Sequence, residues 1–234
     1  MRATVCLPTY NERENLPRMI EALATVLRDG DRVLVIDDDS PDGTGQVADE
    51  LAASHGFVDV LHRERKEGLG RAYVAGFRQA LAGDPELVLE MDCDFSHDPA
   101  DVPRLIAAAE QGADLVLGSR YVPGGRTRNW GLARRLISRG GSVYTGLFLH
   151  MGVKDPTGGF KCFRRAVLEA LDLDAITPRG YAFQIETTYR VKQAGFHVIE
   201  IPITFVDREV GRSKMSRSVV LEAIWRVPLL RIGR

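Results

Sequence analysis

The chain has 234 residues, a length typical of one large domain. Hydrophobic residues make up 44% of it and charged residues 27%, which excludes an intrinsically disordered protein. Its 31 basic and 32 acidic side chains nearly cancel, and this argues against a nucleic-acid-binding protein. The three cysteines, Cys6, Cys93 and Cys162, lie far apart in no metal-binding spacing, which indicates a reducing compartment without a disulfide framework.

The hydropathy of the chain predicts neither a leader nor a membrane span. The sequence begins directly in a strand-like run, Met1 to Val5, so we expect no signal peptide. The longest stretch free of Lys, Arg, Asp and Glu covers residues 140–153, which is shorter than the roughly 20 apolar residues that a spanning helix needs. We therefore expect a soluble, intracellular, globular protein.

Short apolar runs alternate with helical patterns along the first half of the chain. The predicted strands cover residues 4–7, 32–36, 58–62, 86–91 and 114–118, and the predicted helices cover residues 14–28, 41–54, 70–82 and 98–111. This order predicts an α/β fold with a mostly parallel sheet flanked by helices. Ligands of such sheets bind beyond the carboxyl ends of the strands.

The second half of the sequence is less regular. Its predicted helices cover residues 132–151, with an interruption at Gly140-Gly141, and residues 165–171, 181–193 and 216–232. A strand is expected just before residue 165 and another over residues 197–206, where Pro202 indicates a sheet edge or a bulge. The final helix carries apolar and arginine-bearing faces. We expect a single domain over residues 1–234 with a C-terminal amphipathic helical elaboration.

Asp92 and Asp94 follow the apolar strand that ends at Met91. Two carboxylates at positions i and i+2, where the chain leaves a sheet, can converge on Mg²⁺ or Mn²⁺ together with the phosphates of a substrate. The alternative is a polar strand end or a helix cap.

A second acidic cluster, residues 37–42, also follows a buried strand. A carboxylate there could accept hydrogen bonds from a nucleobase or from ribose hydroxyls, whereas Ser40 or Asp42 could instead cap the next helix. A third polar segment, residues 8–12, follows the first strand. Nucleotide binding at the ends of three strands is the interpretation that these segments favour together.

Basic residues are concentrated in two segments. Residues 120–139 hold six arginines and no acid, and residues 208–234 hold seven basic residues against two acidic ones. This asymmetry suggests a face that meets anions. The alternative is that these side chains are merely solvated.

These segments together resemble the family 2 glycosyltransferases of GT-A fold. The motifs that carry the resemblance are residues 8–16, residues 37–44, Gly68-Leu69-Gly70, Asp92-Cys93-Asp94 and Gly118-Ser119-Arg120-Tyr121. More specific motifs are similar to the polyprenol (dolichol) phosphate mannosyltransferase branch, which includes the polyprenol monophosphomannose synthases. These motifs are Arg128-Asn129-Trp130, residues 155–160, residues 180–186 and residues 208–216.

The resemblance implies a metal-dependent, inverting transfer of mannose from GDP-mannose to a polyprenyl (dolichyl-type) phosphate, with Mg²⁺ or Mn²⁺ as cofactor. It assigns residues 1–120 to the nucleotide sugar, residues 121–215 to the acceptor and its phosphate, and residues 216–234 to the amphipathic helix. The implied guanosine contacts are Pro8, Tyr10, Glu12, Ile36 and Asp38. The implied metal ligands are Asp92 and Asp94, with the Cys93 backbone against the nucleotide. The implied ligands of the diphosphate and of the lipid phosphate are Arg120, Arg208 and Lys214.

One position departs from the family pattern. Ser96 stands where family members often carry a glutamine that contacts the metal, so a hydroxyl or a water would have to substitute there. A phosphate monoester has its second pKa near 6 and is already a nucleophile at neutral pH, so no general base is required. His97, next to this segment, is expected to be structural.

The lipid acceptor implies a peripheral position on the cytoplasmic face of a membrane. The final helix could lie in the membrane interface, or it could pack on the domain core or on a membrane-spanning partner subunit. Two alternative functions stay open at this point: transfer of glucose from UDP-glucose to the same lipid, and a catalytically silent nucleotide-sugar-binding subunit.

Overall fold

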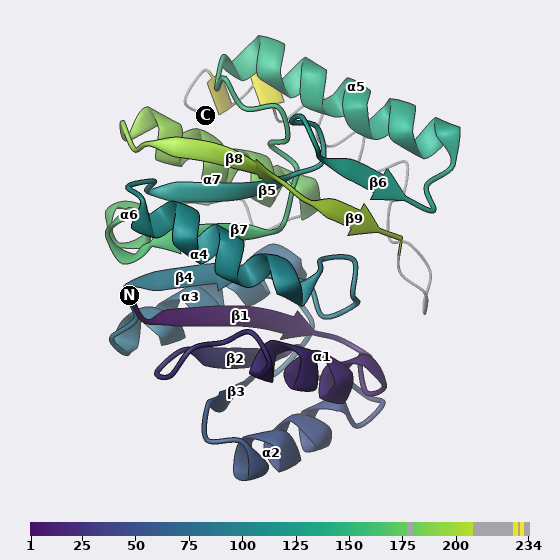
Figure 1. Cartoon of the computed structure of the whole chain (residues 1–234), viewed down its shortest axis with the longest axis vertical. Coiled ribbons are helices and arrows are strands. Elements are labelled where there is room, and N and C mark those ends of the chain that lie inside the picture. Colours follow the sequence, from purple (N-terminus) through teal and green to yellow (C-terminus); the bar gives the residue numbers. More distant parts are fainter. Residues whose placement is uncertain (177–179, 208–226, 229, 232–234) are drawn as a thin grey trace.

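A computed structural model describes residues 1–176, 180–207, 227, 228, 230 and 231 of the chain (Figure 1). Most of the predicted final helix, together with Arg208 and Lys214, lies outside these residues. Among the described residues, no helix is both long enough and apolar enough to cross a bilayer.

A seven-stranded sheet forms the centre of the described structure, in the order β3-β2-β1-β4-β7-β5-β8. Its strands are β1 (Ala3–Thr9), β2 (Arg32–Asp37), β3 (Val58–His62), β4 (Leu87–Glu90), β5 (Leu115–Ser119), β7 (Lys161–Arg164) and β8 (Val198–Pro202). All neighbours pair in parallel except that β7 runs antiparallel between β4 and β5. This confirms the predicted α/β fold with a mostly parallel sheet.

Helices cover both faces of the sheet (Figure 1). The first face packs against α1 (Asn15–Ala24), α2 (Thr44–Ser54) and α4 (Val102–Glu110), which follows the short 3-10 helix η1 (Pro99–Asp101). The second face packs against α3 (Leu69–Ala82), α6 (Arg165–Ala170) and α7 (Gly180–Gln193). Because both faces are covered, β4 and β5 are buried along their whole length.

The predicted strand over residues 197–206 is wrong as a single element. The chain leaves the large sheet after Pro202, and β9 (Thr204–Val206) pairs in parallel with β6 (Arg126–Arg128) in a separate two-stranded sheet. Ile203 joins the two sheets, because its N–H donates to the carbonyl of Ser119 (3.0 Å) and its carbonyl accepts from the N–H of Arg126 (3.0 Å). The expectation of a sheet edge at Pro202 is correct, since β8 is the last strand in the order.

The predicted interruption at Gly140-Gly141 is also wrong, because α5 (Leu132–Leu149) is a continuous helix through both residues. Among the described residues, nothing lies within 4 Å of a Cβ built at either glycine, so neither position serves close packing there. Each glycine costs a helix about 1 kcal/mol relative to alanine, which α5 absorbs without breaking. Two predicted helix boundaries shift as well: α1 ends at Ala24, and α2 begins only at Thr44.

Candidate functional site

The candidate site lies at the carboxyl edge of β2, β1 and β4, which are neighbours in the sheet (Figure 1). Thr9 at the end of β1 is in register with Asp37 at the end of β2, and the N–H of Asp38 donates to the carbonyl of Thr9 (3.1 Å). The polar segments that follow three strands therefore meet at one edge of the sheet. Their juxtaposition follows from the parallel topology, which brings the carboxyl ends of these strands together.

Two carboxylates of the acidic segment after β2 have local structural roles. The side chain of Asp37 accepts hydrogen bonds from the hydroxyl of Ser40 (2.6 Å) and from the hydroxyl of Thr9 (3.3 Å). The side chain of Asp42 accepts from the backbone N–H (3.0 Å) and the hydroxyl (2.6 Å) of Thr44 at the start of α2. The prediction that Ser40 or Asp42 is the N-cap of this helix is wrong, because the N-cap of α2 is Gly43 and Asp42 binds Thr44 from the position before it.

Asp38 has a different environment. Its side chain is buried and forms an ion pair with Arg63, whose backbone N–H donates to the carbonyl of Asp37 (2.9 Å). Burial raises the pKa of Asp38, and the nearby Arg63 cation counteracts this effect only in part. The sequence interpretation missed Arg63. In the sequence, Arg63 is marked only by its position as a basic residue directly after the third parallel strand.

The segment after β1 contributes an aromatic ring and a carboxylate. The ammonium of Lys66 lies 3.3 Å from the centre of the Tyr10 ring, a cation–π contact that the sequence did not predict. The side chain of Glu12 accepts a hydrogen bond from the amide of Asn15 (2.7 Å), and its backbone N–H donates to the hydroxyl of Thr44 (3.0 Å). Glu12 is thus held between α1 and α2.

Pro8 and Ile36 face each other across β1 and β2. The side chain of Ile36 is fully buried against α3, where a Cβ added to Gly76 would lie 2.3 Å from its Cδ1. This close approach requires glycine at position 76. The side chain of Ile36 therefore belongs to the hydrophobic core.

The carboxylates of Asp92 and Asp94 follow β4 at the same edge. The hydroxyl of Tyr73 donates to Oδ1 of Asp92 (3.3 Å), and the backbone N–H of Ser96 donates to Oδ1 of Asp94 (3.0 Å). Cys93 between them is buried in the core, and burial raises the pKa of its thiol. The backbone of Cys93, rather than its thiol, is the part suited to contact a ligand.

The residues present fit a divalent cation. The buried hydroxyl oxygen of Ser96 has no hydrogen-bond partner within the described structure, although it lies next to Asp94 in the turn after β4. Two carboxylates and one hydroxyl are hard oxygen ligands of the kind that Mg²⁺ and Mn²⁺ prefer. In the part of the chain that the structure describes, no group of three or more His, Cys, Asp or Glu side chains could hold a metal ion. The remaining ligands would have to come from a substrate or from water.

His97 packs inside the protein. Its ring stacks on Phe160 at a centroid distance of 4.9 Å, and its Nδ1 accepts the backbone N–H of Asp92 (3.2 Å). Because Nδ1 is an acceptor here, the proton of the neutral ring resides on Nε2. Burial lowers the pKa of His97 to about 4. These contacts fit the structural role expected for this residue.

Arg120, at the end of β5, is buried and forms a bidentate ion pair. Its Nε and Nη2 atoms donate to the carboxylate of Asp155 (2.7 and 2.6 Å), and Nη2 also donates to the hydroxyl of Thr157 (2.8 Å). The guanidinium further lies over the ring of Trp130, 5.5 Å from its centre. The structure thus brings Arg120 together with the 155–160 loop, which the sequence had placed in a separate motif.

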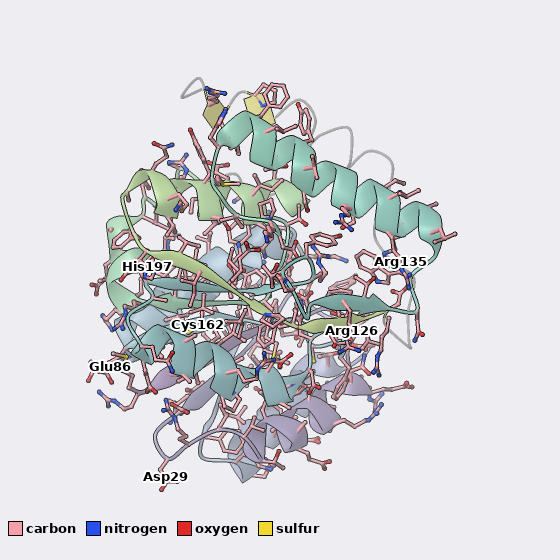
Figure 2. All side chains as sticks on the ribbon, turned by 45° about the horizontal axis from the view of Figure 1, so that its top comes forward. Asp29, Glu86, Arg126, Arg135, Cys162 and His197 are labelled. Atoms are coloured by element: carbon pink, nitrogen blue, oxygen red, sulfur yellow. The ribbon has the colours of Figure 1, made fainter. Side chains whose placement is uncertain are left out.

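Other arginines of the 120–139 segment gather around β6 and the start of α5. Arg126 and Arg128 are exposed on β6, and Figure 2 shows Arg126 and Arg135 at the same end of the molecule. Arg134 lies 4.3 Å from the centre of the Trp130 ring, and its Nη1 donates to the carboxylate of Asp207 (2.7 Å). A basic surface therefore borders the carboxyl edge of β5.

Comparisons with known proteins match this architecture. A polyprenol monophosphomannose synthase of Mycolicibacterium smegmatis is 48% identical over 227 residues, which cover 97% of this chain and 85% of that protein. An undecaprenyl-phosphate mannosyltransferase of Micrococcus luteus is 48% identical over 224 residues, which cover 96% of this chain and 91% of that protein.

Two solved structures share the fold. The glucosyl-3-phosphoglycerate synthase of Mycobacterium tuberculosis, solved with Mn²⁺, UDP-glucose and phosphoglyceric acid, has a TM-score of 0.73 at 21% identity and covers 99% of this chain and 80% of that chain. A mannosyltransferase of Pyrobaculum calidifontis, solved with GDP-Man and Mn²⁺, has a TM-score of 0.62 at 19% identity and covers 91% of this chain and 58% of that chain. These likenesses confirm the GT-A type of fold that the sequence motifs imply. The model of the family described as glycosyl transferase family 2 matches residues 4–172, and the chain therefore belongs to this family.

Proposed function

We propose that the protein transfers mannose from GDP-mannose to a polyprenyl phosphate of the dolichyl type, giving GDP and a β-linked mannosyl lipid. The observation that carries the proposal is the arrangement at the carboxyl edge of the sheet. The carboxylates of Asp92 and Asp94 follow β4 at this edge. The arginine-rich segment that begins at Arg120 follows β5, which is separated from β4 only by β7. This arrangement suits a reaction between two anions that needs both a cation and basic side chains. The two mannosyltransferase relatives support the choice of sugar and lipid.

The donor would bind to residues 1–120. Asp38 is suited to accept hydrogen bonds from the base or the ribose, because it is a buried carboxylate at the end of β2. Tyr10, Glu12 and the backbone of Pro8 and Ile36 surround the same edge. Arg63 and Lys66 lie against Asp38 and Tyr10 and therefore border the proposed donor site.

Asp92, Asp94 and Ser96 would hold Mg²⁺ or Mn²⁺. When bound, such a cation would act as a Lewis acid that offsets the negative charge developing on the leaving diphosphate. The residues of this chain supply oxygen ligands on one side and leave the other side to the donor. The Cys93 backbone would lie against the nucleotide.

The acceptor would bind to residues 121–215. Its phosphate is largely dianionic at neutral pH, so one of its oxygens can attack the anomeric carbon without a general base. The new C–O bond forms as the bond from that carbon to the β-phosphate of GDP breaks, and direct displacement inverts the α-linkage of the donor. We propose that Arg120, Arg208 and Lys214 bind the diphosphate and the lipid phosphate. Arg120 would bind phosphate while its Nε and Nη2 atoms stay paired with Asp155.

We propose that α5, within the acceptor half, faces the membrane. Six large hydrophobic side chains of this helix are exposed: Leu132, Leu136, Ile137, Val143, Leu147 and Phe148. The helix carries three arginines and no acidic residue, so its polar side would attract anionic lipid. The protein would then be peripheral, on the cytoplasmic face. The membrane role first considered for residues 216–234, and a membrane-spanning partner subunit, are further proposals that lie outside the described residues.

The experiment that tests the proposed function measures transfer of labelled mannose from GDP-mannose into polyprenyl phosphate, with and without EDTA, beside labelled UDP-glucose. The proposal expects a mannolipid from GDP-mannose that disappears with EDTA and returns with added Mn²⁺ or Mg²⁺. A glucolipid from UDP-glucose alone would replace the donor and keep the site. No product from either donor, with GDP binding retained, would favour the silent nucleotide-binding subunit.

A further inference from the structure

A tyrosine hydroxyl from a distant helix contacts one of the proposed metal ligands. Tyr73 lies on α3, its side chain is fully buried, and its hydroxyl donates a hydrogen bond of 3.3 Å to Oδ1 of Asp92. No sequence motif marks Tyr73 as part of the candidate site. Its hydroxyl is polar, and its ring lies in the hydrophobic cluster between the sheet and α3, α6 and α7.

The ring of Tyr73 is fixed on two sides. It stacks on Phe77 of the same helix at a centroid distance of 6.0 Å, and on Phe183 of α7 at 6.0 Å with nearly parallel planes. Such packing leaves the hydroxyl little freedom to follow a moving partner. Burial and the nearby carboxylates of Asp92 and Glu90 raise the pKa of Tyr73 well above its ordinary value, so the group remains a hydrogen-bond donor.

Asp92 itself is held at two separate points. Its backbone N–H donates to Nδ1 of His97, and its carboxylate accepts from Tyr73. The first contact fixes the main chain of the turn after β4, and the second restricts rotation of the carboxylate. The side chain of Asp92 is 31% exposed, so its carboxylate remains accessible from solvent.

We propose that Tyr73 is a positioning residue, which orients the carboxylate of Asp92 toward the divalent cation of the donor complex. The inference rests on the proposed function, which identifies Asp92 as a metal ligand. Groups that hold a ligand from behind tune metal affinity strongly even though they never touch the metal. Tyr73 meets this description because it binds one oxygen of the carboxylate from inside the protein.

The test compares the binding of Mn²⁺ by Tyr73→Phe and by the parent protein in the presence of GDP, measured from the electron paramagnetic resonance signal of free Mn²⁺. Tyr73→Phe keeps the ring and removes only the hydroxyl. We expect it to weaken Mn²⁺ binding roughly tenfold, the lower end of the range for such contacts. Transfer by the variant should need about tenfold more Mn²⁺ for half of its maximal rate, and the rate at saturating Mn²⁺ should stay within about twofold of the parent.

Two further variants make the result interpretable. Tyr189→Phe is the matched control, because Tyr189 packs against the same hydrophobic cluster from α7, and it should leave Mn²⁺ binding unchanged. Asp92→Asn tests the metal assignment and should weaken Mn²⁺ binding more than Tyr73→Phe does. Binding of GDP in EDTA should be the same for all variants, which shows that the site is folded.

The outcomes distinguish failure of the metal site at Asp92 from failure of the positioning role of Tyr73. If Tyr73→Phe lowers the unfolding midpoint but binds Mn²⁺ like the parent, Tyr73 only packs the core and the inference is wrong. If Asp92→Asn also binds Mn²⁺ like the parent, the proposed metal site is wrong, and the inference about Tyr73 is wrong with it. Loss of Mn²⁺ binding in Asp92→Asn, with an unchanged Tyr73→Phe, would overturn the inference alone.

Discussion

Arg120 and Asp155 form a bidentate ion pair inside the protein, although they lie 35 positions apart in the sequence. The carboxylate of Asp155 is completely buried and also accepts the backbone N–H of Arg120 (2.8 Å). The pair therefore attaches the 155–160 loop to the end of β5. The family resemblance assigns Arg120 to substrate phosphate, and this geometry adds a structural role that can be separated from it by mutation.

Replacement of Arg120 is expected to destabilise the fold. Arg120→Met would leave the charge of Asp155 buried without its main partner, which costs about 3–5 kcal/mol of unfolding free energy. The double variant Arg120→Met/Asp155→Asn removes both charges and should recover at least half of this loss. Urea denaturation of the three proteins measures the effect. An Arg120→Met protein that is as stable as the parent, yet inactive, would show that Arg120 serves the substrate only.

Asp94→Ala is expected to abolish transfer and leave the fold intact. The carboxylate of Asp94 accepts a local backbone hydrogen bond from Ser96 and is a proposed metal ligand, so alanine at this position should remove the cation from the site. Asp29→Asn is the matched control, since Asp29 is an exposed acid in the loop before β2, at the opposite edge of the sheet. The measurement is mannosyl transfer at saturating GDP-mannose and Mn²⁺. Activity of Asp94→Ala within tenfold of the parent would contradict the metal assignment.

Acid should destabilise the protein through His97. Burial holds its pKa at about 4, below the ordinary value of 6.5, so the unfolded chain binds a proton at a higher pH than the folded chain does. The contribution to stability is therefore complete above pH 6.5 and is lost as the pH falls toward 4, by up to about 3 kcal/mol. The variant His97→Gln can still accept the N–H of Asp92 but does not titrate. The difference in unfolding free energy between the parent and this variant should shrink from pH 7 to pH 4.5, and a constant difference would refute this explanation.

Polar substitutions on α5 should weaken binding to membranes. Leu132→Ser/Leu136→Ser removes two leucines that are 76% and 74% exposed, so the fold should be retained. We expect the variant to lose at least tenfold in affinity for vesicles of phosphatidylcholine with 30% phosphatidylglycerol. Full burial of one leucine side chain contributes about 1.5–3 kcal/mol of free energy. Sedimentation with these vesicles, without polyprenyl phosphate, measures the effect independently of transfer.

The control for α5 is Leu69→Ser, which changes an exposed leucine on α3 and should bind vesicles like the parent. Equal binding of all three proteins would show that another surface attaches the protein to the membrane. Vesicles of phosphatidylcholine alone should bind the parent more weakly, because Arg135 and Arg139 are exposed beside the leucines.

Much of the fold could be predicted because its first five strands and four helices have strong periodicity. The direction of β7 could not be predicted, since a four-residue strand with charged residues at both ends, Lys161 and Arg164, carries no information on strand orientation. The strand β6 was missed because Arg126-Thr127-Arg128 has no apolar pattern, and its pairing depends on where β9 leaves the large sheet.

Part of the candidate site could also be predicted from the sequence. Asp92 and Asp94 stand out because they directly follow a buried strand. The partners Arg63 and Tyr73 do not, because each lies far from its carboxylate in the sequence and meets it only through the packing of β3 or α3. Local patterns thus identified the carboxylates but not the groups that hold them.

The antiparallel strand β7 has a consequence for how such a protein can diversify. Because β5 ends at the carboxyl edge of the sheet and β7 starts there, the segment 120–160 leaves and re-enters the sheet at the same edge. This segment carries β6, α5 and the loop with Asp155, and it can lengthen, shorten or be exchanged without altering the order of the strands. Evolution could therefore replace this segment, which we propose faces the acceptor, while the strands that we propose hold the nucleotide are inherited unchanged.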